Sequence, residues 1–194
     1  MKINTALILC AGFGKRVNPI TTNIPKPLIT YKNITLLENA INLLINLKIE
    51  NVKINVFYLK EKIKKFIEDK KFPIKIEIIE DGETILGTGG GTLNLTNFTN
   101  ETDVLVINPD TIWNSTYLKS IIEMEKFYFD QKIKNVLLIV NNSFCFDKRF
   151  NGDFEFKDNI LLKKKVNDFK YTGCQIINKE ILADKNVTYF PMSE

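Results

Sequence analysis

The sequence predicts an α/β protein with a mostly parallel central sheet. Segments with the residue pattern of strands alternate along the chain with segments whose apolar residues recur at helical spacing. Because parallel strands need crossover connections, this alternation indicates βαβ units. The 194 residues, 44% of them hydrophobic, are enough for one domain with a sizeable core and too few for two ordinary domains. We therefore expect a single domain over residues 1–194.

The strands and helices can be placed in order from local patterns. Apolar runs and period-two alternation predict strands over residues 3–9, 52–56, 74–78, 103–110, 136–140 and 171–177. A capping box from Thr35 to Glu38 opens a helix over residues 36–45, and apolar spacing predicts further helices around residues 63–67 and 117–122. An Asp158-Asn159 turn between residues 151–156 and 160–162 predicts a β-hairpin.

The composition excludes several classes of chemistry. The chain has no histidine, which removes Ser-His-Asp and Cys-His catalysis and most transition-metal sites. Its cysteines are Cys10, Cys145 and Cys174. An odd number without C-x-x-C spacing argues against a disulfide framework and a structural zinc, and suits a reducing compartment. Any chemistry must therefore use carboxylates, lysines, backbone dipoles and hard metal ions.

Charge and hydropathy bear on the partners and the location of the chain. The net charge of +4 comes from lysines spread along the sequence, without the clustered basic and aromatic residues of a nucleic-acid motif. No apolar run reaches the roughly eighteen residues of a membrane span, and the first ten residues lack a cleavage site. We expect no nucleic-acid partner, no membrane association and a cytoplasmic location.

The first candidate site is the stretch L-C-A-G-F-G-K-R-V-N-P-I-T-T-N-I-P-K-P-L, residues 9–28. A strand that breaks into a turn containing Gly12 and Gly14 exposes backbone N–H groups to a bulky ligand. Lys15 and Arg16 add two cations at this turn. Taken alone, the turn is also consistent with a connecting loop whose charges are solvated.

Two familiar nucleotide-binding loops do not match this stretch. The dinucleotide fingerprint G-x-G-x-x-G needs glycine where Val17 stands, and a Walker A loop needs serine or threonine after its lysine, where this chain has Arg16. Arg149 is the only other arginine among the 27 basic residues. One of the two permanently charged, forked side chains therefore lies in this loop.

Two further stretches bring polar groups to the expected ligand edge of the sheet. Residues 80–92, E-D-G-E-T-I-L-G-T-G-G-G-T, hold five of the nine glycines and are either a flexible linker or a ligand loop; a linker inside one domain is disfavoured here. Residues 103–110, D-V-L-V-I-N-P-D, end in Asp110, at the edge where open α/β sheets bind ligands. An Asx turn or a helix N-cap explains Asp110 equally well.

Residues 9–28 resemble the signature of the sugar-1-phosphate nucleotidyltransferases, L-x-A-G-x-G-x-R-x-x-P-x-T-x-x-x-P-K-P-L. The matched fixed positions are Leu9, Ala11, Gly12, Gly14, Arg16, Pro19, Thr21, Pro25, Lys26, Pro27 and Leu28. The T-G-G-G run at 88–91 is similar to that of uridylyltransferases acting on N-acetylmuramate 1-phosphate. Residues 108–110 are similar to the family's N-G-D, with Pro109 in place of glycine.

The resemblance implies a Rossmann-like three-layer nucleotidyltransferase fold. It implies catalytic roles for Arg16, Lys26 and Asp110, with Asp110 as a ligand of catalytic Mg²⁺. The implied nucleotide-binding residues are Leu9, Ala11, Gly12, Gly14, Lys15, Arg16, Lys26, Glu80, Gly87, Thr88 and Gly89. The implied sugar-binding residues, which include elements that resemble the family's G-D-F and T-G, are Asn108, Gly152, Asp153 and Gly173.

Two departures from the family pattern leave parts of the site open. Many members carry Glu-Lys-Pro after the hairpin, where this chain has a run of lysines at 163–165, either a phosphate contact or a solvated face. Members also close with W-x-D-x-G-T, whose Asp is the second magnesium ligand, and no such segment occurs up to Glu194. We therefore expect a C-terminally incomplete domain, either a truncated product or a natural fragment.

The activity implied by the resemblance is transfer of a nucleotidyl group from a nucleoside triphosphate to a sugar 1-phosphate, with release of pyrophosphate. UTP and N-acetylmuramate 1-phosphate are the favoured substrates. Guanylyl transfer to mannose 1-phosphate or a related sugar phosphate is the alternative. From another class, the chain is a regulatory module that binds nucleotide without turnover, and the lysine excess allows a nucleic-acid-binding domain as a third hypothesis.

Overall fold

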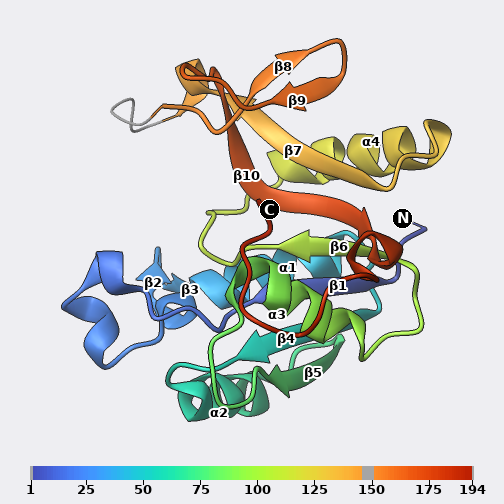
Figure 1. Ribbon diagram of the computed structural model, residues 1–194. Coiled ribbons are helices and arrows are strands. Elements are labelled where there is room, and N and C mark those ends of the chain that lie inside the picture. Colours follow the sequence, from blue (N-terminus) through green and yellow to red (C-terminus); the bar gives the residue numbers. More distant parts are fainter. Residues whose placement is uncertain (1, 146–150, 194) are drawn as a thin grey trace.

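The computed structural model describes residues 2–145 and 151–193, so Arg149 and Glu194 lie outside the described residues (Figure 1). The strands are β1 (Thr5–Leu9), β2 (Thr30–Tyr31), β3 (Ile34–Thr35), β4 (Asn51–Val56), β5 (Lys75–Glu80), β6 (Asp103–Ile107), β7 (Asn135–Asn141), β8 (Glu155–Lys157), β9 (Ile160–Leu162) and β10 (Phe169–Asn178). The α-helices are α1 (Leu36–Asn46), α2 (Lys60–Lys70), α3 (Gly87–Thr96) and α4 (Thr116–Asp130).

The central sheet has six strands in the order β5-β4-β1-β6-β10-β7. β1 pairs in parallel with β4 and β6, and β4 pairs in parallel with β5. β10 lies antiparallel between β6 and β7, a placement that local patterns could not reveal. The predicted α/β class with a mostly parallel sheet is confirmed, and the two edges of the sheet are β5 and β7.

Helices cover both faces of the sheet and produce three layers (Figure 1). α1, α2 and α4 contribute to one hydrophobic cluster, in which Leu37, Ile63 and Ile121 are fully buried. α3 contributes Leu93 and Leu95 to a second cluster on the other face. Within the described ranges, none of the helices combines the length and the hydropathy that a membrane crossing requires.

Local sequence signals explain where several helices and strands begin or end. Thr35 Oγ1 accepts the N–H of Glu38 at 3.1 Å, so the predicted cap begins α1. Asp158 and Asn159 have φ values of 51° and 62°, the left-handed pair of a type I′ turn, and they join β8 to β9 as predicted. The first hairpin strand is shorter than predicted: β8 begins at residue 155, because the preceding residue forms an isolated bridge to β10 instead.

Residues 87–92 of the glycine-rich stretch form the start of α3, so the linker alternative is wrong for this part. Residues 188–192 pass against the start of this helix, where the N–H groups of Gly89 and Gly90 donate to the carbonyl oxygen of Phe190 at 2.9 and 3.2 Å. A Cβ atom at Gly90 would lie 2.0 Å from the carbonyl oxygen of Thr188. These glycines therefore make room for a second stretch of backbone.

We expect Gly90→Ala to lower the stability of the protein, although alanine is the better helix former. The new methyl group must displace the Thr188 carbonyl, and overpacking of this kind costs about 1–3 kcal/mol, against a gain in helix propensity of about 1 kcal/mol. Urea unfolding should show a lower midpoint. Gly12→Ala is the control, because no atom lies within 4 Å of its Cβ position; an equal loss in the control would contradict this explanation.

Candidate active site

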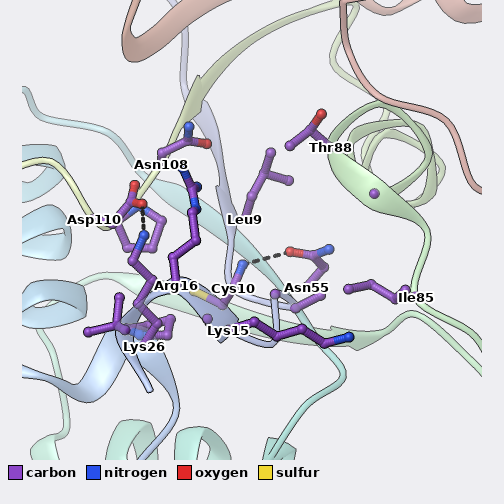
Figure 2. Close-up of a pocket in the computed structure, with 17 residues that line it drawn as sticks. Leu9, Cys10, Lys15, Arg16, Lys26, Asn55, Ile85, Thr88, Asn108 and Asp110 are labelled. Carbon is purple, nitrogen blue, oxygen red and sulfur yellow. Dashed lines mark hydrogen bonds and ion pairs between the residues drawn. The ribbon is translucent and has the colours of Figure 1, made fainter. Parts of the chain in front are cut away.

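A cavity of about 360 Å³ opens at the carboxyl ends of the parallel strands. In Figure 2, Lys26 and Asp110 lie on the left of this cavity, and Ile85 and Thr88 lie on the right. β1, β4 and β6 each deliver residues to it, because the carboxyl ends of parallel strands share one edge of the sheet. Arg16 lines the same cavity from the loop that follows β1.

Most of the residues predicted for the site line this cavity. The structure brings together Leu9, Ala11, Gly12, Gly14, Lys15, Arg16, Lys26, Gly87, Thr88, Asn108 and Asp110. The predicted residues that do not line it are Glu80, Gly89, Gly152, Asp153 and Gly173. The lining residues that were not predicted as site residues are Cys10, Val17, Pro27, Asn55, Ile85 and Pro109.

The loop after β1 keeps its shape through a buried threonine. Gly14 has a φ of +67°, and a side chain there would lie 2.8 Å from Thr21 Cγ2, so glycine is required. Thr21 Oγ1 donates to the carbonyl oxygen of Gly14 at 3.0 Å. The hydroxyl of Tyr58 donates in turn to the carbonyl oxygen of Thr21 at 3.0 Å. These contacts hold the loop in one shape without the help of a ligand.

Lys26 and Asp110 form an ion pair inside the cavity (Figure 2). Lys26 begins a short 3-10 turn between two prolines, which restrict its backbone. Asp110 follows β6 in a loop held by Asn108, whose N–H donates to the carbonyl oxygen of Gly173 at 2.7 Å. The two charged side chains remain 27% and 36% exposed, so an incoming ligand can reach both.

Asn55 was not predicted to belong to the site, yet its side chain connects three segments of the cavity wall. Its Oδ1 accepts the N–H of Cys10 at 2.9 Å, and its Nδ2 donates to the two carboxylate oxygens of Asp81 at 3.1 and 3.0 Å. Gly91 of α3 leaves room for this amide, since a Cβ there would lie 2.6 Å from Nδ2. Local sequence carried no signal for Asn55, because it occupies a polar position of a strand in which apolar and polar residues alternate.

Asp81 is a buried carboxylate behind the cavity. Burial raises its pKa, while hydrogen bonds from Asn55 and Asn94 oppose the shift. These hydrogen bonds therefore favour the charged form of the acid. Through Asn55 it orients the first N–H group of the loop after β1 toward the interior.

Cys10 lines the cavity but is not a reactive thiol. Burial raises its pKa, and the negative charge of Asp110 raises it further. A thiol that stays protonated is neither a good nucleophile nor a metal ligand. The contribution of Cys10 to the site is therefore the backbone N–H that Asn55 holds.

The cavity offers few of the ligands that a magnesium ion prefers. In the part of the chain that the structure describes, no group of three or more His, Cys, Asp and Glu residues is arranged to hold a metal. Asp110 is the only carboxylate among the described residues that line the cavity. Mg²⁺ often binds through one or two carboxylates and completes its shell with substrate phosphates and water. The residues thus fit an ion that arrives with a phosphate ligand.

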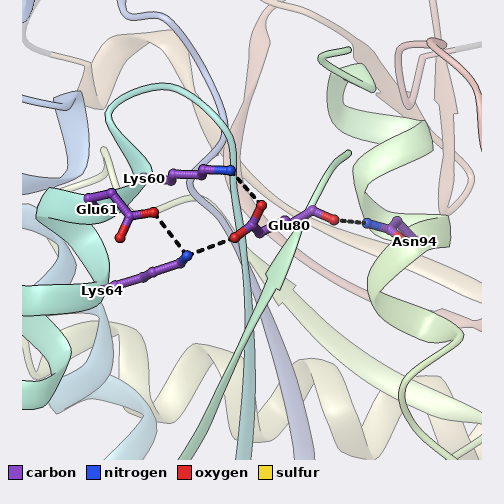
Figure 3. Close-up of polar contacts among 5 residues, drawn as sticks. All are labelled: Lys60, Glu61, Lys64, Glu80 and Asn94. Carbon is purple, nitrogen blue, oxygen red and sulfur yellow. Dashed lines mark hydrogen bonds and ion pairs between the residues drawn. The ribbon is translucent and has the colours of Figure 1, made fainter. Parts of the chain in front are cut away.

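Glu80, predicted to bind nucleotide, does not line the cavity. It ends β5, and its carboxylate pairs with Lys60 and Lys64 of α2 at 2.6 and 2.7 Å (Figure 3). Hydrogen bonds from Lys60 and then Lys64 lower the pKa of Glu80 to about 2. Its neighbour Asp81 has the opposite orientation, because successive side chains at the end of a strand point to opposite faces.

Gly89 and Gly173 lie next to other segments of the chain and do not line the cavity. Gly89 is buried in α3 under residues 188–192. Gly173 has a φ of +86° and lies against Asn108, whose Cβ would be 2.9 Å from a side chain there. Gly173 thus lets the backbone of β10 approach Asn108, and the sugar contact at Gly173 stays a prediction.

Gly152 and Asp153 lie at the base of the hairpin formed by β8 and β9. The N–H of Gly152 donates to the carbonyl oxygen of Asn167 at 2.9 Å. Asp153 Oδ2 accepts the N–H of Tyr171 at 2.9 Å. Both residues fix the hairpin to β10, and neither lines the cavity.

The cavity lies within the part of the chain that matches a known protein family. A family model described as Nucleotidyl transferase matches residues 5–143, a span that holds every residue lining the cavity. The chain belongs to this family. The resemblance inferred from residues 9–28 is thereby confirmed.

Curated relatives match different shares of this chain. The Bifunctional protein GlmU of Methanocaldococcus jannaschii is 40% identical over 108 residues, which are 56% of this chain and 25% of that protein. The N-acetylmuramate alpha-1-phosphate uridylyltransferase of Caulobacter vibrioides is 25% identical over 186 residues, which are 92% of this chain and 77% of that protein. The chain thus spans about a quarter of the GlmU protein it matches.

Solved structures share the fold. The inositol-1-phosphate CTP transferase from T. maritima has a TM-score of 0.81 at 16% identity, over 98% of this chain and 78% of that chain. HddC from Yersinia pseudotuberculosis has a TM-score of 0.75 at 22% identity, over 96% of this chain and 82% of that chain. The predicted Rossmann-like three-layer nucleotidyltransferase fold is confirmed.

We expect Asn55→Leu to destabilise the protein and to loosen the loop after β1. The change leaves the Cys10 N–H and the Asp81 carboxylate buried without their shared partner, and each such loss costs about 1–3 kcal/mol. Urea unfolding should show a lower midpoint, and the Cys10 amide should exchange its hydrogen faster.

Asn94→Leu is the matched control for Asn55→Leu. It removes one 3.3 Å hydrogen bond to Asp81 and one to a backbone carbonyl, but none to Cys10. Equal exchange of the Cys10 amide in the two variants would show that Asn55 does not hold the loop.

Proposed function

We propose that this chain transfers a nucleotidyl group from a nucleoside triphosphate to a sugar 1-phosphate and releases pyrophosphate. The observation that carries the proposal is the convergence of Lys15, Arg16, Lys26 and Asp110 in one cavity, beside the backbone of a glycine turn. Phosphoryl and nucleotidyl transfers need little covalent chemistry from a protein, so positioning and charge neutralisation supply most of the catalysis. A cavity of cations and backbone N–H groups suits that task.

Each group has its own part in the proposed reaction. The turn at Gly12 and Gly14 lets the triphosphate approach the backbone, and the forked guanidinium of Arg16 binds phosphate oxygens in pairs. Lys26 neutralises the reacting phosphates once it turns from Asp110 to the ligand. An oxygen of the sugar phosphate then forms the new bond to the α-phosphorus, while the bond to the bridging oxygen breaks and its electron pair leaves with pyrophosphate.

The cofactor in this proposal is Mg²⁺, held by Asp110. When bound, such an ion neutralises charge on the phosphate oxygens and helps to orient them. The chain itself holds the carboxylate at the end of β6, where Thr111 Oγ1 donates to the carbonyl oxygen of Thr172 at 2.6 Å. Lys26 provides the counter-charge of Asp110 when no ligand is present.

For the substrates, we propose UTP and N-acetylmuramate 1-phosphate. Support comes from the Caulobacter relative, whose match covers most of this chain, and from the T-G-G-G run in α3. Guanylyl transfer to mannose 1-phosphate or a related sugar phosphate is the runner-up. The proposal includes a single nucleotidyltransferase domain working in the cytoplasm, which suits the free thiols of Cys10, Cys145 and Cys174.

A regulatory module that binds nucleotide without turnover is the second candidate. It is favoured by the Lys26–Asp110 ion pair and by the single carboxylate that the described residues bring to the cavity. A matrix of nucleoside triphosphates against sugar 1-phosphates, scored by pyrophosphate release, separates the two candidates. Release with any pair supports the enzyme, and tight nucleotide binding with no release supports the module.

Arg16→Ala and Asp110→Ala should each lower kcat/KM by about 10²-fold or more, the usual cost of removing one preorganised charge from such a site. The thermal midpoint of each variant should stay near that of the parent, because both side chains are partly exposed. Asp69→Ala, on the exposed face of α2, is the control and should keep full activity. Near-parental turnover of either site variant would refute the site assignment.

Pyrophosphate release should stop when EDTA removes divalent ions and should return when excess MgCl₂ is added. Asp110→Asn keeps the size of the side chain but removes its charge, so half-maximal activity should require more Mg²⁺. Titration of activity against MgCl₂ measures this shift. An unchanged titration curve in Asp110→Asn would mean that the ion is held elsewhere.

A further inference from the structure

Asp110 lies in a loop of irregular backbone between β6 and α4. Residues 108–115 connect the two elements, and the side chain of Asp110 points from this loop toward Lys26 (Figure 2). A side chain on a loop is placed only as precisely as the backbone that carries it. The contacts that fix this loop therefore decide where the carboxylate of Asp110 stands.

Trp113 ties the end of this loop to its beginning. Its indole Nε1–H donates to the carbonyl oxygen of Asn108 at 3.0 Å, across five positions of the chain. Trp113 is only 3% exposed, and its ring packs edge-on against the ring of Tyr117 in α4, with 4.9 Å between the ring centroids. Because Asp110 lies between the two joined residues, the loop that carries it closes on a buried side chain.

Asn39 of α1 holds the backbone of Trp113 at two points. Its Oδ1 accepts the N–H of Trp113 at 2.6 Å, and its Nδ2 donates to the carbonyl oxygen of Trp113 at 2.7 Å. One side-chain amide thus satisfies both polar backbone groups of a single residue. A pair of hydrogen bonds fixes the orientation of that residue as well as its position, which a single bond does not.

The same turn of α1 also holds the segment that carries Lys26. The N–H of Leu36, at the first position of α1, donates to the carbonyl oxygen of Ile29 at 3.0 Å, and the N–H of Ile29 donates to the carbonyl oxygen of Lys26 at 3.1 Å. Asn39 follows Leu36 by three residues, about one turn of helix. The start of α1 is therefore a common support for Lys26 and for the loop of Asp110.

We propose that Asn39 is a positioning residue, which sets the place of Asp110 relative to Lys26 and to the metal ion that Asp110 holds. This role rests on the proposed function, in which Asp110 binds Mg²⁺. Asn39 does not line the cavity, so it acts through Trp113 and not by contact with a ligand. A purely structural Asn39 would instead stabilise the fold without any effect on the metal ion.

Hydrogen exchange tests the contact between Asn39 and the loop. Asn39→Leu keeps the size of the side chain but removes both hydrogen bonds to Trp113. The amide hydrogen of Trp113 should then exchange about tenfold faster, the factor that corresponds to the net loss of one hydrogen bond. Asn39→Ala, which leaves space for water at the two backbone groups, gives the same comparison at a smaller loss of stability.

Thr35→Ala is the matched control for Asn39→Leu. It removes the cap of the same helix, which lowers stability by a similar amount, but it leaves both hydrogen bonds to Trp113 in place. The Trp113 amide should therefore exchange more slowly in Thr35→Ala than in Asn39→Leu when urea unfolding shows similar midpoints. Equal exchange in the two variants would overturn the role of Asn39.

Binding of a nucleotide analogue tests the link to the metal ion. Isothermal titration with the α,β-methylene analogues of UTP and GTP, in EDTA and in excess MgCl₂, measures the gain in affinity that Mg²⁺ provides. Asn39→Leu should bind the analogue in EDTA as the parent chain does, because the loop after β1 is unchanged. It should lose about tenfold of the gain from Mg²⁺, the usual effect of removing a group that orients a metal ligand. Thr35→Ala should keep the gain.

Asp110→Asn separates a failure of this role from a failure of the proposed function. It should lose the gain from Mg²⁺, and adding Asn39→Leu to it should cause no further loss, because the two changes act through the same carboxylate. A parent chain without the gain, or Asp110→Asn with the full gain, would overturn the proposed function and the role of Asn39 together. If Asp110→Asn loses the gain while Asn39→Leu keeps it, only the role of Asn39 is overturned.

Discussion

The amide of Asn55 is the contact on which the cavity depends. It joins β4, where it sits, to the loop after β1 through Cys10 and to the end of β5 through Asp81. A buried amide is costly unless its donors and acceptors are satisfied, so these segments can settle in only one relative arrangement. The loop that carries Arg16 is consequently preorganised by a residue that offers the ligand no charge.

Much of the site followed from sequence because the parallel sheet places strand ends together. Lys26 and Asp110 are 84 residues apart in the chain, yet each follows a strand that ends at the same edge. Both the fold and most of the cavity were therefore predictable from three signals. These are the glycine turn, the alternation of strands and helices, and the signature over residues 9–28. What they shared was locality: each signal lay within about twenty residues of sequence.

The parts that could not be predicted depend on long-range contacts. Asn55 looks like any polar residue in an alternating strand until Gly91 and Asp81 are brought beside it. Glu80 and Asp81 differ by one position, and the direction of the strand end decides which of them turns inward. The hairpin residues Gly152 and Asp153 match a family pattern and also hydrogen-bond to β10 and the residues before it, so their sugar contact stays a prediction. A local sequence pattern cannot distinguish a residue that positions other parts of the chain from a residue that contacts the ligand.

The stretch of residues 188–192 lying on α3 has a consequence for the order in which the molecule is made. The N–H of Met192 reaches Thr88 Oγ1, a residue that lines the cavity, across 104 positions of the chain. The loop after β1, β6 and Asp110 are all synthesised before residues 188–192, which follow every strand of the sheet in sequence. Chains that stop short of these residues hold the charged groups of the cavity but lack the backbone that packs on α3. The wall of the cavity at Thr88 is thus completed only after the whole sheet has been made.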